Sequence, residues 1–383
     1  MKFIPYGKQY IDDDDINAVV EVLRSDFLTT GPMVKKFEEA LADYLGVKHV
    51  VVLSNGTAAL HAACFSAGIG PGDEVITTPI TFAASANAVL YCGGTPVFAD
   101  IDPLTYNIDP QSIENQITER TKAIIPVHFT GQPCDMEAIL KIAKKYNLIV
   151  IEDGAHVLGA EFKGDVLGCS GNMMTLSFHP VKHITTGEGG AVVTNDEELY
   201  KKLKLFRSHG ITKDYIDLNH STEPWYYEQH ELGYNYRISD IQCALGVNQL
   251  KKNPDFLKKR RAIADQYNDA FEHIEGIVLQ KQIENVNSSW HIYLIQLELE
   301  KLSVGRSVIF NALRDSNLGV NVHYIPVYYH PYYRNLGYEK GICPKAENLY
   351  ERIITIPLFP TMTKNEVDYV IETVKKIILK YKK

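Results

Sequence analysis

Apolar and polar residues follow a regular alternation of short strands and helices from residue 34 to about residue 200. Residues 34–44 carry apolar side chains at helical spacing, and residues 49–53 form a short apolar run typical of a buried strand. Further strands are expected at 74–78, 96–99, 123–128, 148–151, 176–178 and 190–194, and further helices at 58–67 and 136–146. This order predicts an α/β fold, in which a mostly parallel central sheet has helices on both faces.

The rest of the chain has a different pattern. Residues 206–240 are rich in Tyr, His and Trp, and a connection of this length is usually functional or lies at an interface. Helices are then expected at 238–253, 255–273, 304–316 and 364–380, and strands at 292–299 and 320–325. We therefore expect a large domain over residues 1–250, with an N-terminal arm and an interface loop at 206–240. A small C-terminal α+β domain is expected over residues 251–383.

The composition is that of an ordinary folded protein. The chain has 383 residues, 45% hydrophobic and 22% charged, which is enough to bury a large core. The formal net charge of −8 argues against a general nucleic-acid-binding protein. The six cysteines form no C-x-x-C pair, so neither a disulfide framework nor a metal site is expected. The N-terminus has no apolar signal segment, and no apolar run reaches the ~18 residues of a membrane span, so we expect a cytoplasmic protein without a membrane partner.

Ligands bind at the carboxyl ends of the strands in a sheet of this kind, and three motifs occur at such ends. The first is Ser54-Asn55-Gly56-Thr57, between a predicted strand and a predicted helix. The N–H groups and the dipole of a helix N-terminus favour a phosphate, and the glycine allows a close approach. An ordinary helix cap formed by Thr57 or Ser54 would account for the same residues.

The other two motifs supply a carboxylate and an amine. Asp153 follows the strand predicted at 148–151, where a carboxylate either binds a protonated ring nitrogen or caps a helix. Lys182 lies between a strand and a Gly-rich turn. A partly desolvated lysine forms imines readily because its pKa falls, whereas a lone lysine is usually on the surface.

Together, the three motifs occur in the order expected for a site that binds pyridoxal 5′-phosphate (PLP). The carboxylate keeps the pyridine nitrogen protonated, the lysine holds the aldehyde as an imine, and the helix N-terminus holds the phosphate. Each motif alone has a structural explanation, but their combination indicates a PLP enzyme.

The sequence resembles the DegT/StrS family of PLP-dependent nucleotide-sugar aminotransferases, which have the aspartate aminotransferase-like fold (fold type I). The resemblance covers essentially the whole chain. It is carried by residues 27–32, 54–60, 81–82, 152–156, 177–190 and 233–237. Within the family, the segments 178–182, 224–228 and 322–327 resemble the branch that makes 4-amino sugars in pseudaminic acid biosynthesis.

The resemblance implies that Lys182 is the catalytic residue and that Asp153 pairs with the pyridinium nitrogen. The other cofactor-binding residues that it implies are Gly56, Thr57 and Ser177 at the phosphate, Phe82 on the ring, His156 near the 3-hydroxyl, and Asn235. Asn235 would reach the cofactor phosphate of the neighbouring subunit, so a homodimer with shared active sites is expected. The candidate substrate-binding residues are Tyr6, Thr29, Arg237, His323 and Tyr324.

The implied reaction moves an amino group from L-glutamate to the 4-keto carbon of a UDP-linked 4-keto-6-deoxy-N-acetylhexosamine. Ping-pong kinetics through pyridoxamine phosphate are expected. A different keto-sugar, dTDP- or GDP-linked and with a 3- or 4-keto group, would leave the same motifs. Sugar dehydration is disfavoured because Lys182 is retained. A ligand-sensing protein built on the same fold is the alternative from another functional class.

Overall fold

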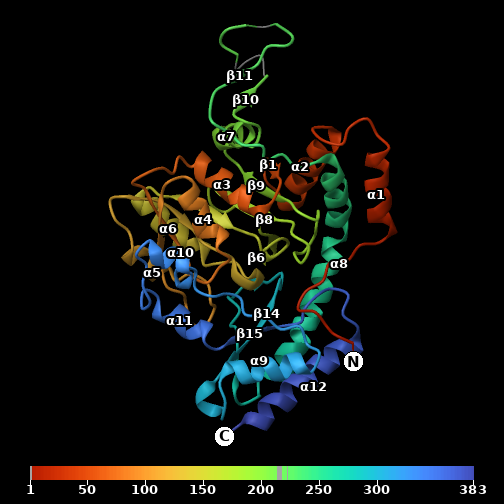
Figure 1. The fold of residues 1–383 in the computed structure, drawn as a ribbon, viewed down its shortest axis with the longest axis vertical. Helices are drawn as coiled ribbons and strands as arrows, with labels where there is room; N and C mark the ends of the chain where they lie inside the picture. The colour runs from red at the N-terminus through yellow and green to blue at the C-terminus, as the bar shows by residue number, and fades with distance from the viewer. Residues whose placement is uncertain (1, 214–217, 222) are drawn as a thin grey trace.

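The computed structural model describes residues 2–213, 218–221 and 223–383. Its centre is a seven-stranded sheet in the order β1-β9-β8-β5-β4-β2-β3 (Figure 1). These strands are β1 His49–Leu53, β2 Glu74–Thr77, β3 Thr95–Phe98, β4 Thr121–Ile125, β5 Ile149–Asp153, β8 Met173–Ser177 and β9 Gly190–Thr194. Only β9 runs against its neighbours, so the mostly parallel sheet predicted from the sequence is confirmed.

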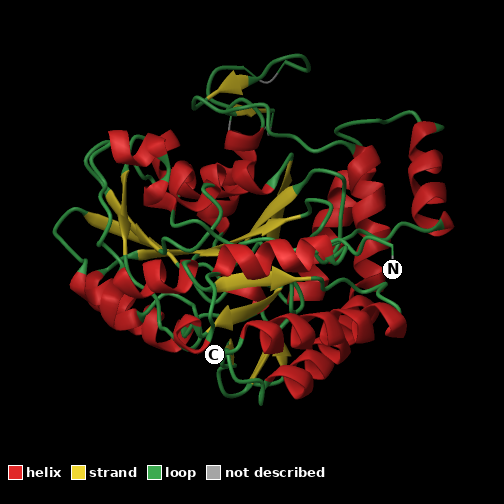
Figure 2. Cartoon of the chain, turned by 60° about the horizontal axis from the view of Figure 1, so that its bottom comes forward, coloured by secondary structure: helices red, strands yellow, loops and turns green. Residues whose placement is uncertain are grey.

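Helices cover both faces of this sheet, as Figure 2 shows. On one face, helices α3 Gly56–Ser66, α4 Ala84–Tyr91 and α7 Glu197–Arg207 share a core with alternate strand residues such as Val51 and Ile151. On the other face, α2 Pro32–Leu45 packs on residues such as Val52, and α5 Pro110–Asn115 and α6 Met136–Tyr146 pack near Val150. The side chains of a strand point alternately to its two faces, and this explains the apolar runs that predicted the strands.

A smaller three-stranded antiparallel sheet follows in the chain. It is built from β12 Ile277–Leu279, β14 Tyr293–Leu297 and β15 Ile353–Ile356. Helices α9 Arg306–Asp315 and α12 Lys364–Tyr381 share its core. The remaining helices and short strands are α1 Asp13–Leu23, α10 Pro331–Asn335, α11 Pro344–Tyr350, β6 Glu161–Phe162, β7 Asp165–Val166, β10 Ile211–Thr212, β11 Glu228–Gln229 and β13 Val286–Asn287.

The two helices predicted at 238–253 and 255–273 form one continuous helix, α8 Asp240–Phe271, so the predicted break was wrong. Pro254 removes one backbone hydrogen bond and normally ends or kinks a helix. Here packing on both sides of the proline outweighs that cost, because Leu250 is buried in the core of the large sheet and Tyr267 in the core of the small one. The predicted boundary at 250/251 lies inside α8, and the division into two domains stays a prediction.

The strand predicted at 320–325 was also wrong. Asn321 makes a single bridge to Thr355, and the chain then continues as an irregular segment. The side chain of Asn321 accepts a hydrogen bond from the backbone N–H of Val322, which favours a turn over a strand ladder. Val320 is part of the core of the small sheet, whereas Val322, Tyr324 and Ile325 line a pocket. Within the described part of the chain, no helix is long and apolar enough to cross a membrane.

Candidate active site

Three of the predicted motifs meet at one edge of the large sheet. Strands β1, β5 and β8 are parallel to one another, so their carboxyl ends lie at the same edge. Asp153 is the last residue of β5 and Ser177 the last residue of β8, and Gly56 begins α3 three residues after the end of β1. Lys182 lies in the connection between β8 and β9. The edge of the sheet therefore brings together a carboxylate, an amine and a helix N-terminus.

Asp153 is buried and held from both sides. Its Oδ2 accepts a hydrogen bond from the Ser85 hydroxyl at 2.7 Å, and its Oδ1 accepts one from the backbone N–H of Ala155 at 3.1 Å. The Ser85 hydroxyl also contacts the Thr81 hydroxyl at 2.8 Å. Ser85 is in the first turn of α4, so this helix fixes the direction in which the carboxylate points.

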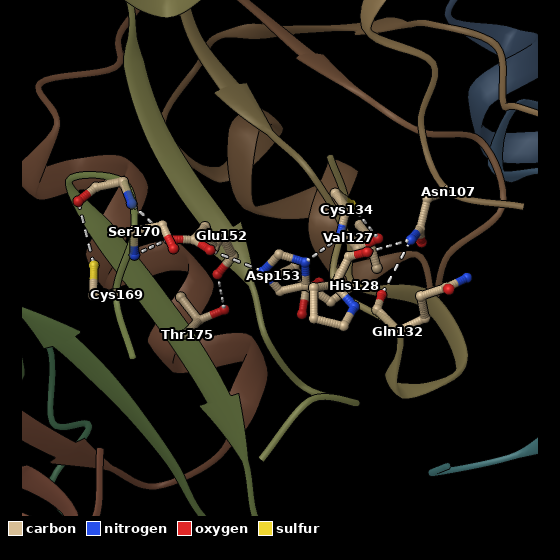
Figure 3. Close-up of polar contacts among 12 residues, drawn as sticks. Asn107, Val127, His128, Gln132, Cys134, Glu152, Asp153, Cys169, Ser170 and Thr175 are labelled. Carbon is tan, nitrogen blue, oxygen red and sulfur yellow. Dashed lines mark hydrogen bonds and ion pairs between the residues drawn. The ribbon is translucent and has the colours of Figure 1, made fainter. Parts of the chain in front are cut away.

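Figure 3 shows a buried network behind Asp153. Glu152 and His128 are fully buried, and their Oε2 and Nε2 atoms lie 2.9 Å apart. The other oxygen of Glu152 accepts the backbone N–H of Ser170 at 2.7 Å, and His128 Nδ1 accepts that of Cys134 at 3.0 Å. Since Nδ1 is an acceptor, Nε2 carries the ring proton and donates a hydrogen bond to Glu152. The backbone N–H of His128 donates to the Asp153 carbonyl at 3.1 Å, so this network fixes the end of β5.

The N-terminus of α3 forms a close cradle beside β8. The Asn55 side chain caps the helix, whereas the alternative read from the sequence was a cap by Thr57 or Ser54. Gly56 and Thr57 are the first two residues of α3, and a Cβ at Gly56 would lie 2.9 Å from the Ser177 Cβ. The first N–H groups of a helix have no partner within the helix and are free for an anion.

Lys182 is partly buried and surrounded by histidines. Its Nζ lies 3.4 Å from His291 Nε2, and the His291 ring is 4.3 Å from that of His156 and 5.5 Å from that of His183. Burial lowers the pKa of Lys182 to about 8, against the attraction of the Asp153 carboxylate. Burial, and next the positive charge of Lys182, lower the pKa of His156 and of His291 well below the usual value. The amine is thus in a site where neutral bases are favoured.

An open aromatic pocket of about 620 Å³ lies beside these groups. Phe82 and Tyr324 line it, and their ring centres are 6.4 Å apart. The Tyr324 hydroxyl contacts His156 Nε2 at 3.2 Å, which ties the pocket to the histidine cluster. Tyr332 and Tyr333 form part of the pocket wall. In addition, Tyr6 and His323 have ring centres 5.3 Å apart, and the His323 ring is 4.8 Å from that of Tyr324.

Three predicted site residues lie on a second pair of segments. Thr29 is exposed and makes a bridge to Ser239. Asn235 is exposed and makes a bridge to Ser208, and Arg237 is partly buried two residues further on. The bridge of Thr29 is to the residue before α8, and that of Asn235 is to the residue after α7. The roles of all the predicted site residues stay predictions.

Several polar residues of the site had no signal in the sequence. His291 contacts Lys182 from a position 109 residues away in the chain. Ser85 lies four residues after Thr81, at the start of α4, and no predicted motif includes it. Within the described ranges, no group of three or more His, Cys, Asp or Glu side chains could hold a metal ion.

Comparison with known proteins gives concordant results. Residues 9–375 match the DegT/DnrJ/EryC1/StrS aminotransferase family. The chain is 43% identical to the spore coat polysaccharide biosynthesis protein SpsC of Bacillus subtilis, over 98% of this chain and 97% of that protein. It is 41% identical to a UDP-4-amino-4,6-dideoxy-N-acetyl-beta-L-altrosamine transaminase of Campylobacter jejuni, over 99% of both chains.

The fold is also that of solved aminotransferases. PseC of Helicobacter pylori, an aminotransferase involved in pseudaminic acid biosynthesis, superposes with a TM-score of 0.92 at 35% identity, over 99% of this chain and 100% of that one. The PLP form of the putative sugar aminotransferase Spr1654 of Streptococcus pneumoniae superposes with a TM-score of 0.91 at 34% identity, over 99% of both chains. These matches confirm the α/β fold of PLP-dependent aminotransferases that was expected from the sequence. The chain belongs to the DegT/DnrJ/EryC1/StrS family of sugar aminotransferases.

Proposed function

We propose that this sugar aminotransferase uses PLP to move an amino group from L-glutamate to the 4-keto carbon of a UDP-linked 4-keto-6-deoxy-N-acetylhexosamine. The observation that carries the proposal is the meeting of Lys182, Asp153 and the α3 N-terminus at one edge of the sheet, beside an open aromatic pocket. The printed name of the Campylobacter jejuni relative supports the choice of sugar and nucleotide.

The residues present fit PLP. Lys182 offers an amine with a pKa of about 8, so an appreciable neutral fraction is available for imine formation near pH 7–8. The α3 N-terminus offers N–H groups for a phosphate. Phe82 lines the pocket and is 64% exposed. Its ring is therefore accessible for stacking on a flat ligand. His156 Nδ1 is buried and has no hydrogen-bond partner among the described residues, so a polar ligand atom would satisfy it.

Bound PLP supplies an electron sink that protein side chains lack. In this proposal Asp153 binds the protonated ring nitrogen, while Ser85 keeps its carboxylate in place. Gly56, Thr57 and Ser177 bind the phosphate at the helix N-terminus. Lys182 then moves a proton at Nζ, taking it from the amino donor and returning it later as a general acid. The transfer runs in two halves, so ping-pong kinetics follow.

The aromatic pocket is the proposed site of the nucleotide-linked sugar. Its volume is in the range of small-molecule sites, and its tyrosines offer both stacking faces and hydroxyl groups. Tyr324 joins this pocket to His156, and Tyr6 and His323 lie next to Tyr324. A keto carbon bound there would lie close to the histidine cluster around Lys182.

We also propose a homodimer in which Asn235 completes the partner's site. Asn235 is exposed in the single chain, and nearby Trp225 and Leu232 expose 75% and 77% of their surfaces. Mixing Lys182→Ala and Asn235→Ala proteins tests this, because one site of a hybrid dimer would carry both native residues. Recovery of activity on mixing is expected. No recovery, with hybrid dimers present, would contradict shared sites.

Isotope transfer tests the proposed reaction. The PLP-loaded protein is incubated with nitrogen-labelled L-glutamate and the UDP-linked 4-keto sugar, and the products are read by mass spectrometry. We expect one labelled nitrogen in the sugar and unlabelled 2-oxoglutarate. Parallel reactions with dTDP- and GDP-linked keto sugars measure the nucleotide preference. Label in one of these sugars, but not in the UDP sugar, would reject the proposed substrate. Retention of the label in glutamate with every sugar would favour a ligand-sensing protein.

A further inference from the structure

His291 is the side chain whose polar atom lies beside the Lys182 amine, at 3.4 Å. It is buried, and its Nδ1 atom has no hydrogen-bond partner among the described residues. The contact is made by Nε2, which accepts a hydrogen bond from the amine when neutral His291 carries its ring proton on Nδ1. No predicted motif includes His291, because it lies in the short segment before β14, far from Lys182 in the sequence.

The backbone that carries His291 is held in an unusual conformation. Trp290 has a φ of 46° and Thr130 a φ of 63°, in the left-handed region that large and β-branched residues rarely adopt. The two segments are joined, because the His291 N–H donates to the Thr130 carbonyl at 2.8 Å. Gly131 allows this approach, since a Cβ there would lie 2.8 Å from the Trp290 nitrogen. Local strain of this kind collects at functional positions.

Arg260, a residue of α8, donates hydrogen bonds to the backbone of the segment that contains Trp290 and His291. Its Nη1 donates to the carbonyls of Trp290, His291 and Leu358, each at 3.2 Å. Arg260 is 1% exposed, and among the described residues it forms no ion pair with a carboxylate. Burial lowers its pKa to about 10, so it is still charged at neutral pH. Burying a guanidinium is costly, and the three hydrogen bonds of Nη1 offset part of that cost, while Nε has no partner among the described residues. These hydrogen bonds fix the residue that contacts Lys182.

The charged groups around His291 favour a proton on Lys182 Nζ over a second proton on the His291 ring. His156, His183 and His291 all have their pKa values lowered well below the usual value by burial and then by neighbouring positive charge. Arg260 adds positive charge on one side, and Asp153 is the negative group near Lys182. His291 is thus a neutral acceptor next to a base with a much higher pKa, and a proton on Nζ stays there.

We propose that His291 is a positioning residue for Lys182: its Nε2 accepts a hydrogen bond from Nζ and holds the protonated amine in place whenever the lysine is free. This inference rests on the proposed function, in which Lys182 moves a proton at Nζ. No bond to His291 forms or breaks, and no proton is transferred to it. Arg260 and the Thr130 backbone act one step further away, by holding His291.

Two substitutions separate the hydrogen bond from the volume of the ring. His291→Gln keeps a polar acceptor, and His291→Phe keeps a flat ring without one. His273→Gln is the matched control, because the His273 side chain is 88% exposed on the surface. Thermal unfolding of each protein, measured first, shows that the variants are folded.

The first readout needs no cofactor. Competitive labelling of the lysines with acetic anhydride across a pH series, read by mass spectrometry, gives the pH at which Lys182 becomes reactive. Wild type is expected to show a midpoint near pH 8. The midpoint of His291→Phe should fall by about one pH unit, because the protonated amine loses its acceptor. The midpoints of His291→Gln and His273→Gln should stay close to that of wild type.

The second readout is turnover of the PLP-loaded enzyme. In His291→Phe we expect kcat to fall by roughly 10- to 100-fold with little change in KM for glutamate, and His291→Gln should recover most of kcat. An unchanged midpoint in the folded His291→Phe protein would overturn the proposal, and so would equal losses of kcat in both variants. Failure of wild type to aminate the sugar would reject the proposed function alone, because the labelling midpoint is measured without cofactor or substrate.

Discussion

The buried Asp153 carboxylate accepts a hydrogen bond from a side chain, the hydroxyl of Ser85. The distance from Ser85 Oγ to Asp153 Oδ2 is 2.7 Å. A hydrogen bond to a charged group in such a place contributes more than one between neutral groups, because water cannot replace the donor. In the proposed function this carboxylate faces the cofactor ring, and its orientation then depends on a residue of α4, outside the motif that contains Asp153.

Ser85→Ala tests this dependence. We expect PLP affinity to fall by about 10-fold or more, since the buried carboxylate loses a donor worth ~1.5–3 kcal/mol. Ser66→Ala is the matched control, because the Ser66 hydroxyl is buried and has no hydrogen-bond partner among the described residues. Equilibrium titration of the two cofactor-free variants with PLP measures the affinity of each for the cofactor. Equal affinities in the two variants would mean that Ser85 does not support Asp153.

At the scale of elements, α3 approaches β8 more closely than any side chain at Gly56 would allow. A Cβ at this position would lie 2.9 Å from the Ser177 Cβ, closer than such atoms approach in proteins. The helix N-terminus and the end of β8 together form the proposed phosphate cradle. A substitution that moves them apart should weaken anion binding.

Gly56→Ala is therefore expected to weaken PLP binding by about 10-fold and also to lower thermal stability, because α3 or β8 must shift to relieve the contact. Gly70→Ala is the control, because a Cβ there meets no heavy atom within 4 Å. Affinity for PLP and for inorganic phosphate can be measured by calorimetry. A loss of stability in Gly56→Ala without a loss of affinity would contradict the cradle.

The sequence predicted the elements whose signal is local. The strand at 49–53 and the helix at 136–146 were predicted at their observed bounds, because apolar periodicity and turn residues mark them. The break at Pro254 and the strand at 320–325 were wrong, because long-range packing and a pocket determine those segments. For the same reason Asp153 and Lys182 were found from motifs, whereas His291 required the tertiary structure.

On the scale of the whole molecule, the candidate site contains several buried histidines that are neutral at pH 7. Burial lowers the pKa of His323 to about 4, and it lowers the pKa values of His156, His183 and His291 well below the usual value of about 6.5. Between pH 6.5 and these lowered values, the unfolded chain binds more protons than the folded one. The free energy of unfolding must then fall as the pH decreases through that range.

We expect the cofactor-free protein to lose up to about 1.4 kcal/mol per pH unit for each of these histidines as the pH drops below about 6.5. Urea unfolding at a series of pH values measures this slope. His273→Gln removes an exposed histidine and should leave the slope unchanged. A free energy of unfolding that stays constant from pH 6.5 to pH 5 would contradict the burial of neutral histidines in this site.

The proposed function requires that Lys182 bind PLP covalently and that an amino group pass from glutamate to a keto sugar. The visible absorption spectrum of the PLP-loaded protein, recorded before and after each substrate, tests it most directly. We predict a band from the lysine-bound cofactor, its loss when L-glutamate is added, and its return when the UDP-linked 4-keto sugar follows. Lys182→Ala should lack the band. Absence of the band from wild type at saturating PLP would contradict the proposed function, and so would a band that glutamate does not change.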